Sequence, residues 1–165
     1  MNMNTNLGED KDILIRSPKI SDLPAMVKLF LELMEYNAKY EPHMTLPENE
    51  HIVFEERIRK YMKGPDKFCI FVAEYILTKQ VIGYLLGKIE FAWEKYHGYI
   101  THFVITSSFR KKGVGTRLFS HGCDWFKQKK LSRIELRITV NNPLSSSFWR
   151  KMGFTPYVET MYFNI

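Results

Sequence analysis

The sequence predicts a single α/β domain built around a mixed β-sheet. The chain has 165 residues, of which 45% are hydrophobic and 15% aromatic, and this is enough for one domain with a substantial core. Helical and strand-like periodicities alternate along the chain, which favours helices interleaved with strands. The predicted order of elements is β-α-α-β-β-β-α-β-α-β. We assign residues 13–165 to the domain and residues 1–12 to a polar N-terminal tail without the apolar stretch of a secretory signal.

The N-terminal part of the domain contains a short predicted strand, residues 13–16, and two predicted helices. A Ser-Asp pair can cap the first helix, and Pro24 suits its first turn. Its apolar positions recur with the helical period: Leu23, Met26, Val27, Phe30 and Met34. A loop over residues 41–47 leads to the second helix, residues 48–62, which a Gly-Pro pair ends.

Three β-rich segments follow, at residues 67–75, 81–89 and 99–105. A turn at Lys79 and Gln80 joins the first two into a predicted hairpin. The third is an apolar run that leads directly into a basic turn.

The C-terminal third begins with that glycine-containing turn, residues 110–116, and a helix over residues 116–130. Residues 133–140 alternate apolar and polar with a period of two, which is typical of a strand with one buried face. A short helix is predicted over residues 143–151, with a glycine after it as its stop signal. Residues 160–165 are predicted to form a closing strand, either inside this sheet or at the interface of a homodimer.

The charge balance favours an anionic partner, because the net charge is +6 and the pI is about 9.2. A nucleic acid, a membrane surface and a polyphosphate cofactor all meet that condition. The chain has no run of about 18 apolar residues, so no membrane span is predicted. Cys69 and Cys123 lie far apart and the five histidines are scattered, so no metal site is expected and the thiols fit a reducing cytoplasm.

The most informative segment is the turn between the third β-rich run and the next helix. It contains Arg110, Lys111, Lys112, Gly113 and Gly115. The first amides of a helix lack internal partners and lie at the positive end of the helix dipole, so they attract anions. A Walker loop is absent, and the dinucleotide fingerprint fails because Leu118 replaces its last glycine. What remains is an R-x-x-G-x-G pattern after a strand, or a basic helix cap without a ligand.

A second segment carries a matching pattern. The pattern starts with an asparagine and continues with a small residue three positions later and an aromatic residue seven positions later. It ends with glycine and an aromatic residue at eleven and twelve positions after the asparagine. The residues that match it are Asn142, Ser145, Trp149, Gly153 and Phe154. These offsets resemble the later motif of the GNAT superfamily of acetyl-CoA-dependent N-acetyltransferases, and the R-x-x-G-x-G loop resembles the family's pyrophosphate loop. Ile15-Arg16 with Asp22 is similar to the family's first strand and helix, so the resemblance covers residues 13–165.

The resemblance implies the GNAT fold and direct transfer of the acetyl group from acetyl-CoA to a primary amine, without an acyl-enzyme. In the family, the strand before the loop pairs its backbone with the pantetheine arm, and the loop amides hold the pyrophosphate. The residues that the resemblance assigns to acetyl-CoA or coenzyme A are Phe103, Val104, Ile105, Arg110, Lys111, Lys112, Gly113, Val114, Gly115, Thr116, Asn142, Ser145 and Trp149.

Trp149 departs from the family, which usually has a tyrosine there to protonate the leaving thiolate. A thiol has a pKa of about 8.5, so its thiolate can leave without a strong acid to protonate it. Tyr157 or Tyr162 could substitute, and packing is the simpler role for both.

An attacking amine must be neutral, and an alkyl ammonium has a pKa of about 10, so a base or a chain of waters to one is needed. Where the family often carries the base, this chain has Thr101, a poor base. The candidate catalytic residues are therefore Tyr99, His102 and Glu90. Tyr99 shares a face with Thr101 in a regular strand, whereas His102 points to the other face unless a bulge redirects it. A purely structural role is the alternative for His102.

The family's acceptor site lies where the first two helices cover the sheet, residues 31–56 here. That stretch is rich in glutamate: Glu32, Glu35, Glu41, Glu48, Glu50, Glu55 and Glu56. These carboxylates could attract a cationic amine, or they form a solvated helix face. A small amine, an aminoglycoside and a protein N-terminus all satisfy the pattern.

Two other functions stay open at this level. One is a catalytically silent sensor that binds acyl-CoA, which the unusual Trp149 favours. The other is a basic nucleic-acid-binding module that uses residues 110–112 and 127–130. The sequence has no helix-turn-helix or RNA-binding signature, which argues against nucleic acid as a partner.

Overall fold

The computed structural model describes residues 12–41, 43 and 45–163. The predicted N-terminal tail therefore lies outside the described residues, apart from Asp12. The strands are β1 (Ile13–Arg16), β2 (Phe68–Tyr75), β3 (Gln80–Ala92), β4 (Lys95–Ile105) and β5 (Ile134–Leu136). The helices are α1 (Leu23–Ala38), α2 (Glu50–Met62), α3 (Val114–Gln128) and α4 (Pro143–Lys151), with short 3-10 turns η2 (Ile20–Asp22) and η3 (Ser107–Phe109). No helix within these ranges combines the length and hydropathy needed to cross a membrane.

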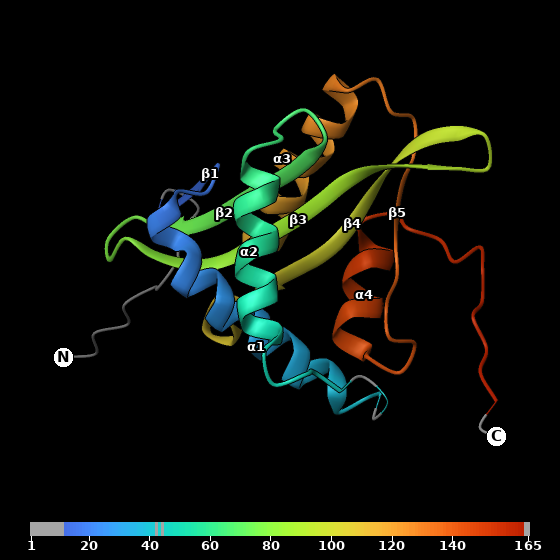
Figure 1. Cartoon of the computed structure of the whole chain (residues 1–165), viewed down its shortest axis with the longest axis horizontal. Coiled ribbons are helices and arrows are strands. Elements are labelled where there is room, and N and C mark those ends of the chain that lie inside the picture. The colour runs from blue at the N-terminus through green and yellow to red at the C-terminus, as the bar shows by residue number, and fades with distance from the viewer. Residues whose placement is uncertain (1–11, 42, 44, 164–165) are drawn as a thin grey trace.

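The five strands form one mixed sheet in the order β1-β2-β3-β4-β5 (Figure 1). Neighbouring strands are antiparallel except β4 and β5, which are parallel. α1 and α2 cover one face of the sheet, here called the front face, and α3 covers the back face (Figure 1). The predicted mixed α/β domain is therefore confirmed.

The front layer is held by apolar side chains that α1 and α2 turn toward the sheet. The helical stripe predicted for the first helix is confirmed at Leu23, Met26 and Phe30, which are buried. From α2, Phe54 and Ile58 join them, and the Phe30 and Phe54 rings stack with centroids 4.2 Å apart. Burial of each such side chain contributes roughly 1.5–3 kcal/mol, so this face fixes both helices on the sheet.

On the back face, α3 packs against the sheet through Leu118 and Phe126, which are completely buried. Glycine in β4 makes room for this contact. A Cβ at Gly98 would lie 2.6 Å from the Phe126 ring, so a larger residue would force α3 away from the strand.

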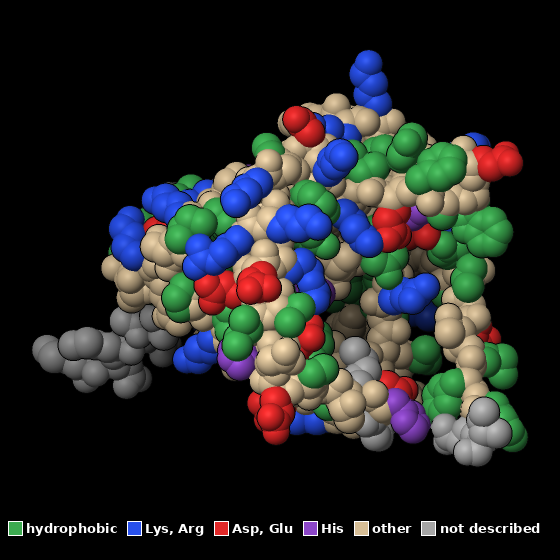
Figure 2. Space-filling model, viewed as in Figure 1, with side chains coloured by type: hydrophobic (Ala, Val, Ile, Leu, Met, Phe, Trp, Pro, Cys, Tyr) green, Lys and Arg blue, Asp and Glu red, His purple; other side chains and the backbone are tan. Residues whose placement is uncertain are grey.

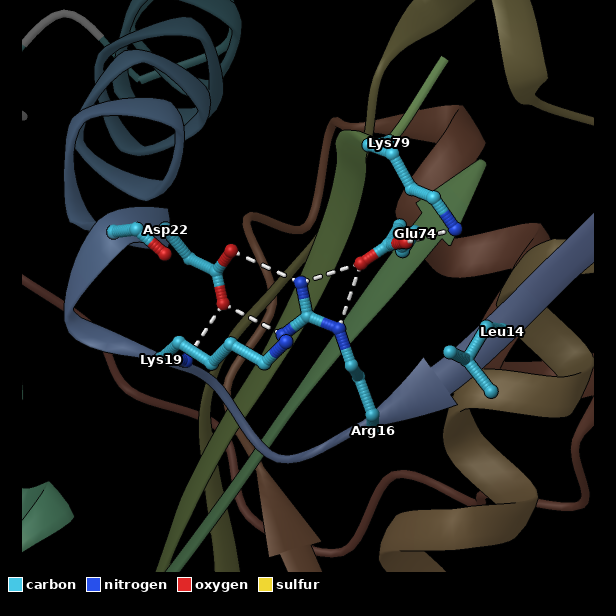
Figure 3. A pocket seen from close by; sticks show the side chains of 7 residues that line it. Leu14, Arg16, Lys19, Asp22, Glu74 and Lys79 are labelled. Carbon is cyan, nitrogen blue, oxygen red and sulfur yellow. Dashed lines mark hydrogen bonds and ion pairs between the residues drawn. The ribbon is translucent and has the colours of Figure 1, made fainter. Parts of the chain in front are cut away.

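A buried ionic cluster fastens β1 to the start of the first helical layer (Figure 3). The Arg16 guanidinium lies 2.7 Å from Asp22 Oδ2 and 2.6 Å from Glu74 Oε2. Burial alone would raise the pKa of Asp22, but hydrogen bonds from Arg16 and from the Lys19 amide hold it below its ordinary value. The pocket around this cluster lies at the β1 edge of the sheet, away from β4 and β5, so it belongs to a structural anchor.

β5 is shorter than predicted. The alternating segment 133–140 forms a strand only over Ile134–Leu136, which pairs with Gly98, Tyr99 and Ile100 of β4. The pairing ends where β4 bulges, and a bulge interrupts the ladder of hydrogen bonds.

The predicted closing strand is not formed by residues 160–163, and residues 164–165 lie outside the described part of the chain. Met161 and Phe163 are 84% and 88% exposed. The backbone groups of a strand need hydrogen-bond partners on a neighbouring strand. The neighbour available within one chain, β5, is only three residues long and provides too few of them.

β3 and β4 form a longer hairpin than the predicted segments 81–89 and 99–105. Its turn contains Trp93 and Glu94, whose φ angles are 54° and 60°. Hairpin turns usually give such angles to Asn or Gly. The sequence lacks this turn signal, and it therefore does not predict the strand residues on either side.

Candidate active site

A β-bulge in the middle of β4 sets the geometry of the candidate site. The pairing with β3 skips Thr101, whose hydroxyl donates to the Leu86 carbonyl at 3.0 Å. The extra residue changes the alternation of side chains along the strand. Tyr99 and His102 therefore both lie on the front face, which a regular strand would not allow.

His102 is enclosed by aromatic side chains of the front layer. Its ring centroid lies 5.4 Å from that of Phe30 and 5.5 Å from that of Phe54, and its Nδ1 lies 3.4 Å from the Tyr84 hydroxyl. Burial, aided by the positive charge of Arg57, lowers the pKa of His102 to about 4. His102 is therefore neutral at pH 7 and a weak base. Burial also raises the pKa of Tyr84, so that hydroxyl stays protonated.

A polar cluster occupies the front face next to His102, where β3, β4 and β5 lie side by side. This front-face cluster consists of Lys88, Glu90, His97, Tyr99, Arg133, Glu135 and Arg137. His97 is only 5% exposed, and its Nε2 lies 3.9 Å from Glu90 Oε2 and 3.7 Å from Glu135 Oε2. Glu90 also binds the Lys88 ammonium at 2.5 Å. Glu135 accepts from Arg133 Nε at 2.8 Å.

Tyr99 lies at the centre of this cluster. It pairs in register with Lys88 on one side and with Glu135 on the other, and the Lys88 ammonium lies 5.7 Å from its ring centroid. Burial raises the pKa of Tyr99, although Arg137 opposes that shift, so the phenol stays protonated at neutral pH.

The two other tyrosines considered as proton donors are placed differently. The Tyr157 hydroxyl donates to the Glu135 carboxylate at the edge of the front-face cluster, and this bond raises the pKa of Tyr157. The Tyr162 ring instead packs against His43, with centroids 5.1 Å apart.

The three predicted catalytic residues Tyr99, His102 and Glu90 thus lie on one face of the sheet. His97 and Glu135 share that face and are absent from the prediction. The alternation of segment 133–140 already places Glu135 on the polar side of its strand. His97 becomes visible only through the register of the long hairpin, which sets it opposite Glu90.

The turn after β4 ends in a helix N-terminus. α3 begins at Val114, after Gly113 with a φ of +79°. A Cβ at Gly113 would touch nothing, so the backbone conformation, and not lack of space, favours glycine there. The Arg117 amide bonds to the Gly113 carbonyl, which leaves the amides of Val114, Gly115 and Thr116 without helical partners. Together they present partial positive charge.

The three basic residues of the turn have different surroundings. Arg110 donates to the Ile105 carbonyl at 2.8 Å and to Glu32 at 3.2 Å, so it fastens the turn to β4 and α1. Lys111 and Lys112 are exposed and can meet an anion. The loop charge that faces solvent therefore comes from these two lysines.

The edge of β4 away from β3 is free where the predicted cofactor residues lie. The Thr106 amide donates to the Ile82 carbonyl, so by alternation the backbone groups of Phe103 and Ile105 face away from β3. β5 has ended by this point, and in the described part of the chain no strand pairs with them. Val104 buries its side chain in the front core. Unpaired strand groups can bind an extended ligand.

The second predicted motif supports α4 beside this edge. The Asn142 Oδ1 accepts from the Ser145 amide at 3.1 Å, and its Nδ2 donates to Asn37 Oδ1 at 3.1 Å, which joins α4 to the end of α1. Trp149 is buried among aromatic rings of β4, α3 and α4, including Phe103 at 5.0 Å. Trp149 is thus a packing residue without an acidic proton.

The glutamates predicted to attract a cationic acceptor are partly neutralised. The pairs within 4 Å are Glu32–Arg110, Glu50–Arg57 and Glu55–Arg59. The α1–α2 stretch therefore carries less free negative charge than its sequence suggests. The described residues also contain no group of three or more His, Cys, Asp or Glu side chains placed to hold a metal ion.

Comparisons with known proteins identify the family and the fold. Residues 29–154 match the model of the Acetyltransferase (GNAT) family. A tetramutant of the BH1408 protein from Bacillus halodurans is 18% identical with a TM-score of 0.80, covering 92% of this chain and 99% of its own. Glucosamine-6-phosphate N-acetyltransferase from Arabidopsis thaliana is 20% identical with a TM-score of 0.71, covering 92% and 97%. AAC(6')-Iy in complex with the bisubstrate analogue CoA-S-monomethyl-acetylneamine is 16% identical with a TM-score of 0.70, covering 93% and 97%.

Proposed function

Because the chain belongs to the GNAT family of acetyltransferases, which use acetyl-CoA, we propose that it moves the acetyl group directly to a primary amine of a small molecule. One observation carries the proposal: the bulge of β4 separates the front-face cluster from a free strand edge, and that edge leads to the N-terminus of α3. The free strand edge and the helix N-terminus can bind the acetyl donor, and the front-face cluster can bind the amine that approaches it.

For the donor, we assign the amides of residues 114–116 with Lys111 and Lys112 to the pyrophosphate. The outward-facing backbone groups of Phe103 and the Ile105 amide are assigned to the pantetheine arm, since the Ile105 carbonyl already accepts from Arg110. Acetyl-CoA supplies an activated thioester when bound. Asn142, Ser145 and Trp149 act indirectly, because they hold α4 against this path.

The chemistry requires a neutral amine and a place for its proton. We assign that proton to the Glu90 carboxylate, with the Tyr99 hydroxyl between the amine and Glu90 as the hydrogen-bonding relay. Neutral His102 lines the acceptor side, and a backbone N–H at the bulge stabilises the carbonyl oxygen. Since a thiolate can leave unaided, Trp149 needs no acid role.

The acceptor is assigned to small molecules because one structural neighbour is named as a glucosamine-6-phosphate N-acetyltransferase and another as an aminoglycoside acetyltransferase. A protein N-terminus is the competing acceptor. We also infer a reducing cytosolic setting, supported by the free thiols of Cys69 and Cys123.

Donor binding is tested by thermal shift with acetyl-CoA, free CoA and ADP. A ligand at about 100 times its Kd adds roughly 2.7 kcal/mol to the free energy of unfolding. Lys112→Glu should weaken this shift by placing a carboxylate at the loop, whereas Lys63→Glu, an exposed lysine after α2, should not. No shift for the unaltered protein would contradict the assigned function, and a shift without turnover of any amine would favour an acyl-CoA sensor.

We further propose that the chain forms a homodimer through its exposed apolar end. The hairpin tip residues Phe91, Trp93 and Tyr96 and the C-terminal Met161 and Phe163 are all more than half exposed, and both segments lie at the same end of the molecule (Figure 1). Aromatic side chains of this size cover about 150–250 Å² each, so the surface approaches the roughly 800 Å² per partner of a stable interface. A second copy would also offer the C-terminal segment a strand partner.

A further inference from the structure

One cation of the front-face cluster is left without a partner. Glu135 lies in β5, and Arg133 and Arg137 flank the strand; the three alternate with Ile134 and Leu136, which pack against the back core. Arg133 is held by Glu135. In the described part of the chain, no carboxylate lies within ion-pair distance of Arg137, and its side chain is exposed.

The position of Arg137 is set by the register of β5. Leu136 pairs with Ile100, so Arg137 is the first residue after the ladder ends, at the level of the Thr101 bulge. It is close enough to Tyr99 to oppose the rise in that phenol's pKa. The free guanidinium therefore stands beside the proposed site of acetyl transfer.

The carboxylates of this face are already compensated. Glu90 binds Lys88, and Glu135 binds both Arg133 and the Tyr157 hydroxyl. Lys88, Arg133 and Arg137 carry three positive charges against the two negative charges of Glu90 and Glu135, so the lysine, arginine and glutamate side chains leave one positive charge in the cluster. Figure 2 shows Lys and Arg side chains over α2 and beside the hollow between α2 and the β5 side.

A spare guanidinium recognises planar or tetrahedral oxyanions, because its N–H groups form paired hydrogen bonds with carboxylate or phosphate. A polycationic acceptor would find no unpaired carboxylate in the cluster. An acceptor with an anionic group would find Arg137.

We propose that Arg137 determines acceptor specificity, and that the acceptor is a small amine that also carries a carboxylate or phosphate group. This rests on the proposed acetyl transfer. The amine is oriented to Tyr99 while the anion binds Arg137, and the distance between the two groups selects among anionic amines.

The test is thiol release from acetyl-CoA with matched acceptors that differ only in the anion. An amino sugar phosphate is compared with the unphosphorylated amino sugar, an amino acid with its amide, and spermidine serves as the polycation. For the unaltered protein, kcat/KM should favour the anionic member of at least one pair by tenfold or more. The pair that shows the preference identifies phosphate or carboxylate as the recognised group.

Arg137→Gln should lower that ratio of kcat/KM by about 10- to 100-fold, the loss of a charged hydrogen bond, chiefly through KM. Arg137→Lys should give an intermediate ratio, because lysine keeps the positive charge but cannot form the paired hydrogen bonds of a guanidinium. Arg150→Gln, an exposed arginine on α4, is the matched control and should keep the ratio.

Preference for the uncharged or polycationic acceptors, or an unchanged ratio in Arg137→Gln, would overturn the inference while leaving acetyl transfer intact. Absence of turnover with every amine would instead overturn the proposed function itself. Acetyl-CoA thermal shifts of each variant confirm that it is folded.

Discussion

At the residue scale, His102 shows how packing changes the chemistry of a side chain. Two phenylalanine rings and the Tyr84 hydroxyl surround it, and its pKa falls to about 4. A histidine in the unfolded chain titrates near about 6.5. Between these values the unfolded chain binds more protons than the folded chain.

The free energy of unfolding should therefore fall as the pH drops from about 6.5 toward about 4, by at most ~3 kcal/mol for this group. His102→Gln, which can still bond with Tyr84, should remove that part of the pH dependence. Chemical denaturation at several pH values measures both proteins. Equal slopes in this window would show that His102 is not the group responsible. Asp22 cannot mimic the effect, because its pKa lies below 3.8 and its contribution is lost only at lower pH.

Arg16 is the second residue whose surroundings predict a measurable effect. It neutralises two buried carboxylates, Asp22 and Glu74. Arg16→Met should destabilise the fold by about 3–5 kcal/mol, because Asp22 is left buried without a cation and Glu74 keeps only the more distant, exposed Lys79. Arg59→Met breaks an exposed pair with Glu55 and should cost less than about 1 kcal/mol. Similar losses in the two variants would contradict this account of the anchor.

At the scale of elements, the fit of α3 on the sheet depends on Gly98. Gly98→Ala should lower the free energy of unfolding by about 1–3 kcal/mol, because its methyl group would meet the Phe126 ring at 2.6 Å. Phe126→Leu opens that space, so the double variant should lose less than the sum of the two single losses. Strict additivity in urea denaturation would mean that the two residues do not compete for space.

The elements also show what sequence periodicity can and cannot reveal. Residues 133–140 alternate well enough to predict a strand, yet only Ile134–Leu136 pair, because the ladder stops at the β4 bulge. A bulge depends on the pairing of two strands, and no local pattern marks Thr101. The sequence does predict the glycine loop before α3, because the glycines, the basic residues and the start of the helix are all contiguous in the chain.

The candidate site divides in the same way. The loop residues and Tyr99, Glu90 and His102 are visible as residue types near recognisable elements. His97 and Arg137 acquire meaning only from register and from the charges of their neighbours. Sequence alone gives no account of which carboxylates are already neutralised.

At the scale of the whole molecule, the proposed homodimer depends on the exposed apolar side chains of the β3–β4 hairpin tip and the C-terminal segment. Trp93 occupies a turn position with a φ of 54°, which Asn adopts more readily than Trp. Trp93→Asn should therefore leave the chain folded and weaken the homodimer by about tenfold or more in Kd, since Trp is prominent among side chains that carry binding energy. Sedimentation across a range of concentrations measures this. A monomer at all concentrations for the unaltered chain would contradict the dimer, as would a Kd unchanged by Trp93→Asn.

The central claim is that this chain transfers an acetyl group to an amine, and simultaneous measurement of both products tests it most directly. Free CoA thiol and acetylated amine are quantified together, with acetyl-CoA and a panel of anionic, neutral and cationic small amines and a peptide N-terminus. We expect the two products in equal amounts with at least one small amine, at a rate that Glu90→Gln reduces about 100-fold or more, as expected for loss of a general base. Binding of acetyl-CoA without either product from any of these amines would contradict the claim.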